Sequence, residues 1–295
     1  MYRLANVAWG WTPIPENLPK DDSLFRIADK IKEIGFEGVD YLTTQESIDK
    51  YFTERLSKDL GDYCRSIGLP PNVLVYQSFD WHGEADSVKA HWEHLEKHIQ
   101  IAQWIGCNIV SCLSVPPRGA ARPHASFASA AMKRSYNLPD DYDYEADWNS
   151  LAESFKKALK LVKTAGMRMS IECFPGTMVS TPEAMVKMTN DVGDPDFGIQ
   201  LDTNHLVHQS IDPEFAINIV GGKRIFNVHC KDHDGVTRGN IPCGTGIIDY
   251  QRVIHALEKV GYEGSLTIEQ EFTDNPRRYN LQGYEHIRKC LAGTY

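Results

Sequence analysis

Four segments in the second half of the chain read as β-strands, and each ends in a residue type that binds metal ions. These residues are Glu172, Asp202, His229 and Glu269, at the ends of segments 167–172, 197–202, 225–229 and 265–269. Parallel strands would deliver all four side chains to one point. Three carboxylates and one imidazole form an oxygen-rich ligand set that suits Mn²⁺, Mg²⁺ or Co²⁺, and Zn²⁺ remains an alternative. We therefore expect a divalent metal site, with Mn²⁺ as its activating ion.

Side-chain alternation supports this grouping, because residues two positions apart in a strand face the same side of a sheet. A polar residue stands two positions before each expected ligand: Ser170, Gln200, Asn227 and Thr267. The residue between the two members of each pair is apolar and is expected to face the surrounding helices. The polar pairs would then share the other face, where they point at one another.

The elements that must position these residues follow a regular alternation of apolar, β-branched runs and amphipathic runs. Further strands are expected at 4–9, 38–42, 72–77 and 108–113, and helices at 22–34, 54–67, 88–105, 148–164, 182–189, 212–219 and 250–260. Glycines that suit left-handed C-caps follow five of these helices: Gly35, Gly68, Gly106, Gly166 and Gly261. The pattern predicts a (β/α)₈ TIM barrel, in which residues 1–295 form a single domain. Active sites of such barrels lie at the carboxyl ends of the strands.

Residues 116–147 interrupt this alternation of strands and helices after the fourth expected strand. They are too many for an ordinary βα loop, whose typical length is about 2–6 residues. The segment is basic around Arg118, Arg122, His124 and Arg134, and then acidic from Asp140 to Asp147. Two interpretations stay open: a surface excursion, or a lid or partner-binding element over the mouth of the barrel.

The composition bounds the class of protein. A hydrophobic content of 42% fits a globular chain with a sizeable core, and a net charge of −9 argues against a general binder of nucleic acid. No stretch approaches the roughly 20 apolar residues of a membrane span, and the start lacks the pattern of a signal peptide. The seven cysteines have no CxxC spacing, so we expect reduced thiols in a cytoplasmic protein. We also expect a homo-oligomer.

Five short motifs in the C-terminal half occur in an ordered series at 171–172, 201–205, 228–232, 244–250 and 261–269. With these motifs, nearly the whole chain resembles the xylose-isomerase-like TIM barrels, specifically the sugar phosphate isomerase/epimerase family. That group includes ketose 3-epimerases, hydroxypyruvate isomerases, inosose dehydratases and the catalytic subunits of C-glycoside deglycosidases.

The resemblance implies roles for individual residues. The four strand-end residues would be the metal ligands, and Glu172 and Glu269 would also carry protons. His205 would contact substrate oxygens. Glu271 has the same strand parity as Glu269 and stays open as the alternative fourth ligand. Ketose epimerases commonly carry an arginine shortly after the metal-binding histidine, and Arg238 is the nearest candidate here.

The expected chemistry begins with a proton on a carbon next to a carbonyl. A divalent cation stabilises the enediolate as a Lewis acid, and a carboxylate on each side of the sugar moves the proton. Return of the proton to the same carbon gives epimerisation, and return to the neighbouring carbon gives isomerisation. Loss of a β-leaving group instead makes a lyase of the inosose dehydratase or C-glycoside deglycosidase kind. For that reading His124 is the candidate further acid or base, and a small second subunit is the candidate partner that orders the insertion.

Candidate substrate contacts stand near the ends of other strands. Trp9 follows the first strand, Trp81 and His82 follow the third, and Lys231 stands just past His229. Aromatic faces suit the C–H groups of a sugar. The sequence has no glycine-rich phosphate loop, so an unphosphorylated sugar, cyclitol or glycoside is the expected substrate.

The sequence leaves three further interpretations to compare with this site. His91, His94 and His98 lie near one helical face, which we interpret as a polar outer face and not as a rival metal site. An endonuclease IV-like DNA repair enzyme would need a larger ligand set and a positive track for phosphates. A sugar-binding protein without its own chemistry is disfavoured by the paired glutamates.

Overall fold

The computed structural model describes residues 2–11, 23–78, 80–82, 85–120, 138–236, 241–271 and 273–294. His124 and Arg238 lie outside these residues, as does much of segment 116–147, so the expectations for them stay predictions.

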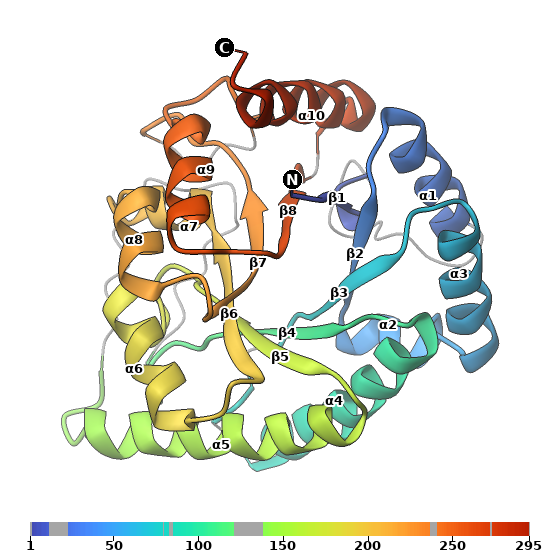
Figure 1. The fold of residues 1–295 in the computed structure, drawn as a ribbon. Helices are drawn as coiled ribbons and strands as arrows, with labels where there is room; N and C mark the ends of the chain where they lie inside the picture. The colour runs from blue at the N-terminus through green and yellow to red at the C-terminus, as the bar shows by residue number, and fades with distance from the viewer. Residues whose placement is uncertain are drawn as a thin grey trace.

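Parallel strands close into a barrel in chain order (Figure 1). They are β1 Leu4–Val7, β2 Gly38–Thr43, β3 Pro71–Tyr76, β4 Ile109–Leu113, β5 Arg168–Glu172, β6 Phe197–Asp202, β7 Ile225–Cys230 and β8 Ser265–Ile268. Every expected strand is present at nearly the expected bounds. The prediction of a single-domain (β/α)₈ TIM barrel is therefore confirmed.

Helices connect the strands and lie outside the ring that the strands form (Figure 1). They are α1 Ser23–Ile34, α2 Gln45–Lys50, α3 Glu54–Ser66, α4 Ala85–Ile105, α5 Tyr144–Thr164, α6 Pro182–Val192, α7 Thr203–His208, α8 Pro213–Val220, α9 Tyr250–Lys259 and α10 Pro276–Ala292, with the short 3-10 helix η1 Trp9–Trp11. Among the described residues, no helix combines the length and the apolar character needed to cross a membrane.

Local sequence explains where the helices begin and end. The side chains of Thr53, Thr181 and Asp212 accept hydrogen bonds from the first turns of α3, α6 and α8, which satisfies backbone N–H groups that have no partner inside a helix. The five glycines expected at helix ends all have positive φ, between 69° at Gly68 and 114° at Gly35. Glycine adopts this conformation without a Cβ clash, so the chain turns back toward the next strand.

The two faces of the strands differ as their alternation predicted. The apolar residues beside the expected ligands, such as Ile171, Leu201 and Val228, are buried in the core between the barrel and the helices. Inside the barrel, Asn227 and Thr267 reach across the interior to Asp40 on β2. A register shift between Ile199 and Gln200 in the pairing of β6 with β7 accompanies this arrangement.

Three helices were not predicted from the sequence: α2, α7 and α10. The apolar signal of α10 is weak, because two of its four buried residues are Asn280 and Gly283. The start of α5 is also a correction, since the helix begins at Tyr144. The last four residues of the expected insertion, 144–147, are therefore the first turn of a helix that Asp143 caps.

Candidate metal centre

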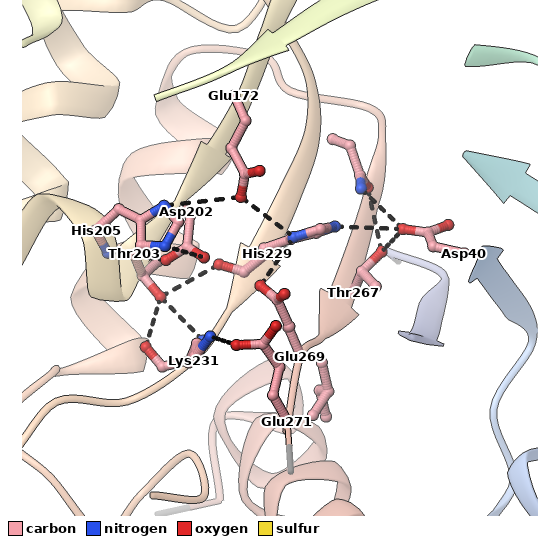
Figure 2. Close-up of polar contacts among 12 residues, drawn as sticks. Asp40, Glu172, Asp202, Thr203, His205, His229, Lys231, Thr267, Glu269 and Glu271 are labelled. Atoms are coloured by element: carbon pink, nitrogen blue, oxygen red, sulfur yellow. Dashed lines mark hydrogen bonds and ion pairs between the residues drawn. The ribbon is translucent and has the colours of Figure 1, made fainter. Parts of the chain in front are cut away.

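The four expected ligands come together at the carboxyl ends of β5 to β8 (Figure 2): Glu172, Asp202, His229 and Glu269. One ligand atom from each of the four residues lies within 4.8 Å of the others. All four side chains are buried. The strand register explains the convergence. Asp202 pairs with His229, while Glu172 pairs with Gln200 and His229 with Thr267, so neighbouring ligands lie level with each other or two residues apart and face the same side.

The donor set fits a divalent cation. Nδ1 of His229 lies 3.0 Å from Oε2 of Glu269 and 3.8 Å from Oε1 of Glu172. Oδ2 of Asp202 is buried and has no hydrogen-bond partner among the described residues, although Oδ1 accepts a bond of 2.9 Å from the backbone N–H of His205. A buried carboxylate oxygen without a donor is costly, and a hard cation is a group that would satisfy it.

The choice between Glu269 and Glu271, which strand parity left open, follows from the geometry. Glu269 contributes to the cluster of four. Glu271 instead forms an ion pair with the ammonium of Lys231 (Figure 2). It also accepts a hydrogen bond of 3.3 Å from Nε1 of Trp9. Because both of its oxygens already have partners, the structure favours Glu269 as the fourth ligand.

Before a cation binds, Glu172 and Asp202 favour their protonated forms, whereas Glu269 favours its ionised form. Burial, followed by the charge of Glu269, raises the pKa of Glu172 to about 8 and the pKa of Asp202 to about 7. Burial opposes the charge on Glu269 as well, but Lys231 and His229 together hold its pKa well below the usual range. Burial likewise disfavours a charged His229, yet Glu269, Asp40 and Glu172 raise its pKa well above 6.5. Crowded carboxylates of this kind are typical of sites built for a positive charge.

Three of the expected substrate contacts lie next to the cluster. Nδ1 of His205 is 3.7 Å from Oε1 of Glu172, and Nε2 of His205 is 3.7 Å from Oδ2 of Asp202. The Trp9 ring lies 6.0 Å from the His229 ring. Lys231 is 2% exposed and its charge acts on the cluster carboxylates. The phenyl ring of Phe174, which the sequence did not single out, packs edge-on to His205 at 4.8 Å.

Trp81 and His82 make their recorded contacts within the protein. Trp81 packs in the core against His91, with ring centroids 4.4 Å apart, and against Phe155, with centroids 4.8 Å apart. Its Nε1 donates to the backbone carbonyl of Leu113. The structure thus packs Trp81 among core side chains, and its role as a stacking surface for a sugar stays a prediction.

His82 anchors the connection between β4 and α5. Its Nδ1 lies 2.9 Å from Oδ1 of Asp147, and its Nε2 lies 2.9 Å from the carbonyl oxygen of Pro116. Asp147 also accepts hydrogen bonds from the backbone N–H of Arg118 and from the hydroxyl of Tyr142. The contacts of His82 join the two ends of segment 116–147. They account for the position of its side chain without any contact to a substrate.

His91 and His98 do not form a polar outer face as expected. Both are fully buried, and their Nδ1 atoms bond the hydroxyls of Ser78 (2.9 Å) and Thr43 (2.7 Å). Burial lowers the pKa of His91 to about 4 and the pKa of His98 to about 3. These histidines are uncharged parts of the packing between α4 and the barrel.

His98 should make the fold sensitive to acid. Its stabilising contribution is complete above the unfolded pKa of 6.5 and is lost as the pH falls toward the folded value of about 3, because the unfolded chain then binds a proton that the folded chain excludes. His98→Asn keeps a polar group near the position of Nδ1 and removes this titration. We expect the stability advantage of the wild type over His98→Asn to shrink by about 3 kcal/mol between pH 7 and pH 4.

Urea denaturation across this pH range measures that change. The matched control is His94→Asn on the same helix, where the side chain is partly exposed and contacts Asp49. An equal pH slope for the wild type and His98→Asn would contradict the account.

Two buried aspartates were missed in the sequence. Asp232 accepts hydrogen bonds from the backbone N–H groups of Gly244, Gly246 and Ile248, so it holds the segment after β7 in place. Asp40 lies within β2 and is 0% exposed. The sequence signal for Asp40 was a charged residue within a mostly apolar expected strand, which indicates a specific partner inside the fold.

Comparison with known proteins agrees with this architecture. The family model of the xylose isomerase-like TIM barrel matches residues 28–290. An inosose dehydratase of Glaesserella parasuis serovar 5 (strain SH0165) is 26% identical over 220 residues, which cover 67% of this chain and 70% of that protein. An inosose dehydratase of Histophilus somni (strain 129Pt) is 27% identical over 175 residues, but these cover only 51% of this chain and 57% of that protein.

Solved structures share the fold at low sequence identity. An L-ribulose 3-epimerase superposes with a TM-score of 0.76 at 18% identity, with 100% of this chain and 96% of that chain covered. The apo form of 3-keto-D-glucoside 4-epimerase, YcjR, from E. coli has a TM-score of 0.76 at 14% identity, with 98% and 100% covered. Since the family model matches most of the chain and the fold agrees, the chain belongs to the xylose isomerase-like TIM barrel family.

Proposed function

We propose that this protein is a divalent-metal-dependent sugar isomerase or epimerase, with Mn²⁺ as the preferred ion. The observation that carries the proposal is the buried cluster in which two glutamates share one centre with an aspartate and a histidine. Its similarity in fold to an L-ribulose 3-epimerase and a 3-keto-D-glucoside 4-epimerase supports the assignment.

In this proposal Glu172 and Glu269 move the proton. When bound, the cation supplies positive charge that stabilises negative charge on neighbouring substrate oxygens. One glutamate takes the proton from the carbon beside the carbonyl, and the other returns it from the opposite side.

The residues around the cluster would bind the substrate. His205 would hold a hydroxyl or carbonyl oxygen next to Glu172, since its ring is within 4 Å of that carboxylate. The ammonium of Lys231 would contact a further oxygen, and Trp9 would cover the C–H face of the ring. These groups suit an unphosphorylated sugar, cyclitol or glycoside. In this proposal Arg238 remains a candidate substrate contact.

A lyase is the second candidate, because proteins with sequence similarity to this chain are named inosose dehydratases. Elimination of water from a keto-cyclitol begins with the same removal of a proton beside a carbonyl. It then requires a group that assists departure of the hydroxyl. His124 is the candidate for that role, and a small second subunit is the candidate partner of the segment that carries it.

NMR spectroscopy in D₂O tests the proposal and separates the two candidates. The purified protein with Mn²⁺ removed and Mg²⁺ added would be incubated with a panel of ketoses, inososes and 3-keto-glycosides. Mg²⁺ is diamagnetic and leaves the spectra sharp. We expect a product that carries solvent deuterium at the carbon beside the carbonyl. An epimer or isomer supports the first candidate, and an unsaturated or dehydrated product supports the lyase. A product that forms only with a nicotinamide cofactor would contradict both.

A further inference from the structure

We infer that Asp40, on β2, is a positioning residue that orients the imidazole of His229 toward the metal centre. Oδ2 of Asp40 lies 3.5 Å from Nε2 of His229, on the side of the ring opposite the cluster (Figure 2). The inference rests on the proposed metal-dependent function, and it assigns a role to a residue that lies on the far side of His229 from the carboxylates.

The carboxylate of Asp40 is held in place by three strands. Oδ2 accepts hydrogen bonds from Nδ2 of Asn227 at 3.0 Å and from the hydroxyl of Thr267 at 2.9 Å. Oδ1 accepts a hydrogen bond of 3.2 Å from the backbone N–H of Val73. With donors from β3, β7 and β8, the carboxylate has little freedom to turn away from His229.

The imidazole of His229 is thereby placed between two sets of negative charge. Its Nδ1 faces Glu269 at 3.0 Å and Glu172 at 3.8 Å, and its Nε2 faces Asp40. A proton on Nε2 is attracted to Asp40, so the nitrogen that would give up its proton to a cation is Nδ1, which faces the cluster. Histidine ligands of metals commonly have a carboxylate beside their other nitrogen, which fixes the ring and makes it a stronger donor.

Hydrogen bonds account for the two oxygens of Asp40 as acceptors, but not for the position of its carboxylate beside His229. The three donors are neutral and reach both oxygens, so an ionised carboxylate accepts all three, whereas an amide would turn its NH₂ group toward some of them. Within the described ranges, His229 is the one basic side chain recorded within ion-pair distance of Asp40. Besides its three neutral donors, the carboxylate of Asp40 therefore has a basic partner in the ring that it orients.

The first test is the affinity of the full-length protein for Mn²⁺, measured by isothermal titration calorimetry. Asp40→Asn keeps the shape of the side chain and removes the charge. We expect its affinity to fall about 10–100-fold, the usual effect of removing a carboxylate behind a histidine ligand. Thr267→Val removes one donor to Asp40 and should weaken binding in the same direction by a smaller factor. If Asp40→Asn does not fold, as judged by circular dichroism, Thr267→Val carries the test.

The matched control is Asp147→Asn, since Asp147 is also a buried aspartate with several donors but makes its contacts between β4 and α5. Its affinity for Mn²⁺ should stay within about threefold of the wild type, because it contacts no expected ligand. Affinities of Asp40→Asn and Thr267→Val that equal the wild-type value would overturn the inference.

Crystal structures of the metal-free wild type and Asp40→Asn give a readout that does not need the metal. We expect the His229 ring to keep Nδ1 toward Glu269 in the wild type, and to rotate or shift in the variant. An unchanged ring in the variant would overturn the positioning role. If the wild type itself binds no Mn²⁺, the proposed metal-dependent function fails, while the orientation of the ring still decides the role of Asp40.

Discussion

Replacing Glu172 with glutamine should lower kcat on the order of 1,000-fold. Glutamine keeps the size of the side chain but cannot exchange a proton, and general acid–base groups contribute roughly 100- to 10,000-fold to catalysis. The same change removes a charged ligand from the buried cluster, so the bound metal should also fall. Turnover of the substrate found in the NMR panel, with metal content measured by atomic emission on the same sample, separates the two effects.

Ser170→Ala is the matched control for Glu172→Gln. Ser170 lies two positions earlier on β5, is equally hidden from solvent, and its hydroxyl has no hydrogen-bond partner among the described residues. We expect its kcat to stay within a few fold of the wild type, because the substitution removes no hydrogen bond. Full activity together with full metal occupancy in Glu172→Gln would end the assignment of Glu172 as both ligand and proton carrier.

Metal affinity should depend strongly on pH, and this is the second large effect. Because the pKa of Glu172 is raised to about 8 and that of Asp202 to about 7, both carboxyls gain protons as the pH falls from 8 to 6. A cation must displace these protons to bind. We expect binding of Mn²⁺ to be weaker at pH 6 than at pH 8 by roughly 500-fold, the competition from two protons with these pKa values. Titration calorimetry in buffers of different ionisation enthalpy counts the protons that are released.

The raised pKa values of Glu172 and Asp202 also make the folding stability of the protein depend on pH. An acid whose pKa is higher in the folded state favours folding at low pH, so the metal-free protein should lose this contribution as the pH rises from about 4 through 8. Bound Mn²⁺ compensates for the charges that appear. Added Mn²⁺ should therefore raise Tm more at pH 8 than at pH 6. A pH-independent affinity, with no protons released, would show that the cluster does not titrate in this way.

Part of the site could be read from sequence because the relevant signals are local. Strand parity places Ser170 with Glu172 and Thr267 with Glu269 on one face whatever the rest of the fold does. The glycines after the helices have positive φ as expected, because a helix end and its C-cap lie within a few residues of each other. The repeated order of strand and helix then leaves a parallel barrel as the simplest closed arrangement.

Other features depended on contacts between distant parts of the chain. Parity could not separate Glu269 from Glu271, and the ion pair of Glu271 with Lys231, just past the end of β7, separates them. Strand position could not show that Trp81 contacts Phe155 on α5, which places it in the core. In both cases the deciding partner lies tens of residues away, where local patterns carry no information.

The sequence by itself determined the strands, most of the helices and the residue types at the strand ends, since these follow from side-chain periodicity and from capping. Only the tertiary structure decided which side chains from distant strands contact those residues or their neighbours. Asp40 and Asn227 are 187 residues apart and hydrogen-bond across the interior of the barrel. Closing the barrel creates that contact, because it brings β2 opposite β7 and removes water from between them. The burial that raises the pKa values of Glu172 and Asp202 arises in the same way.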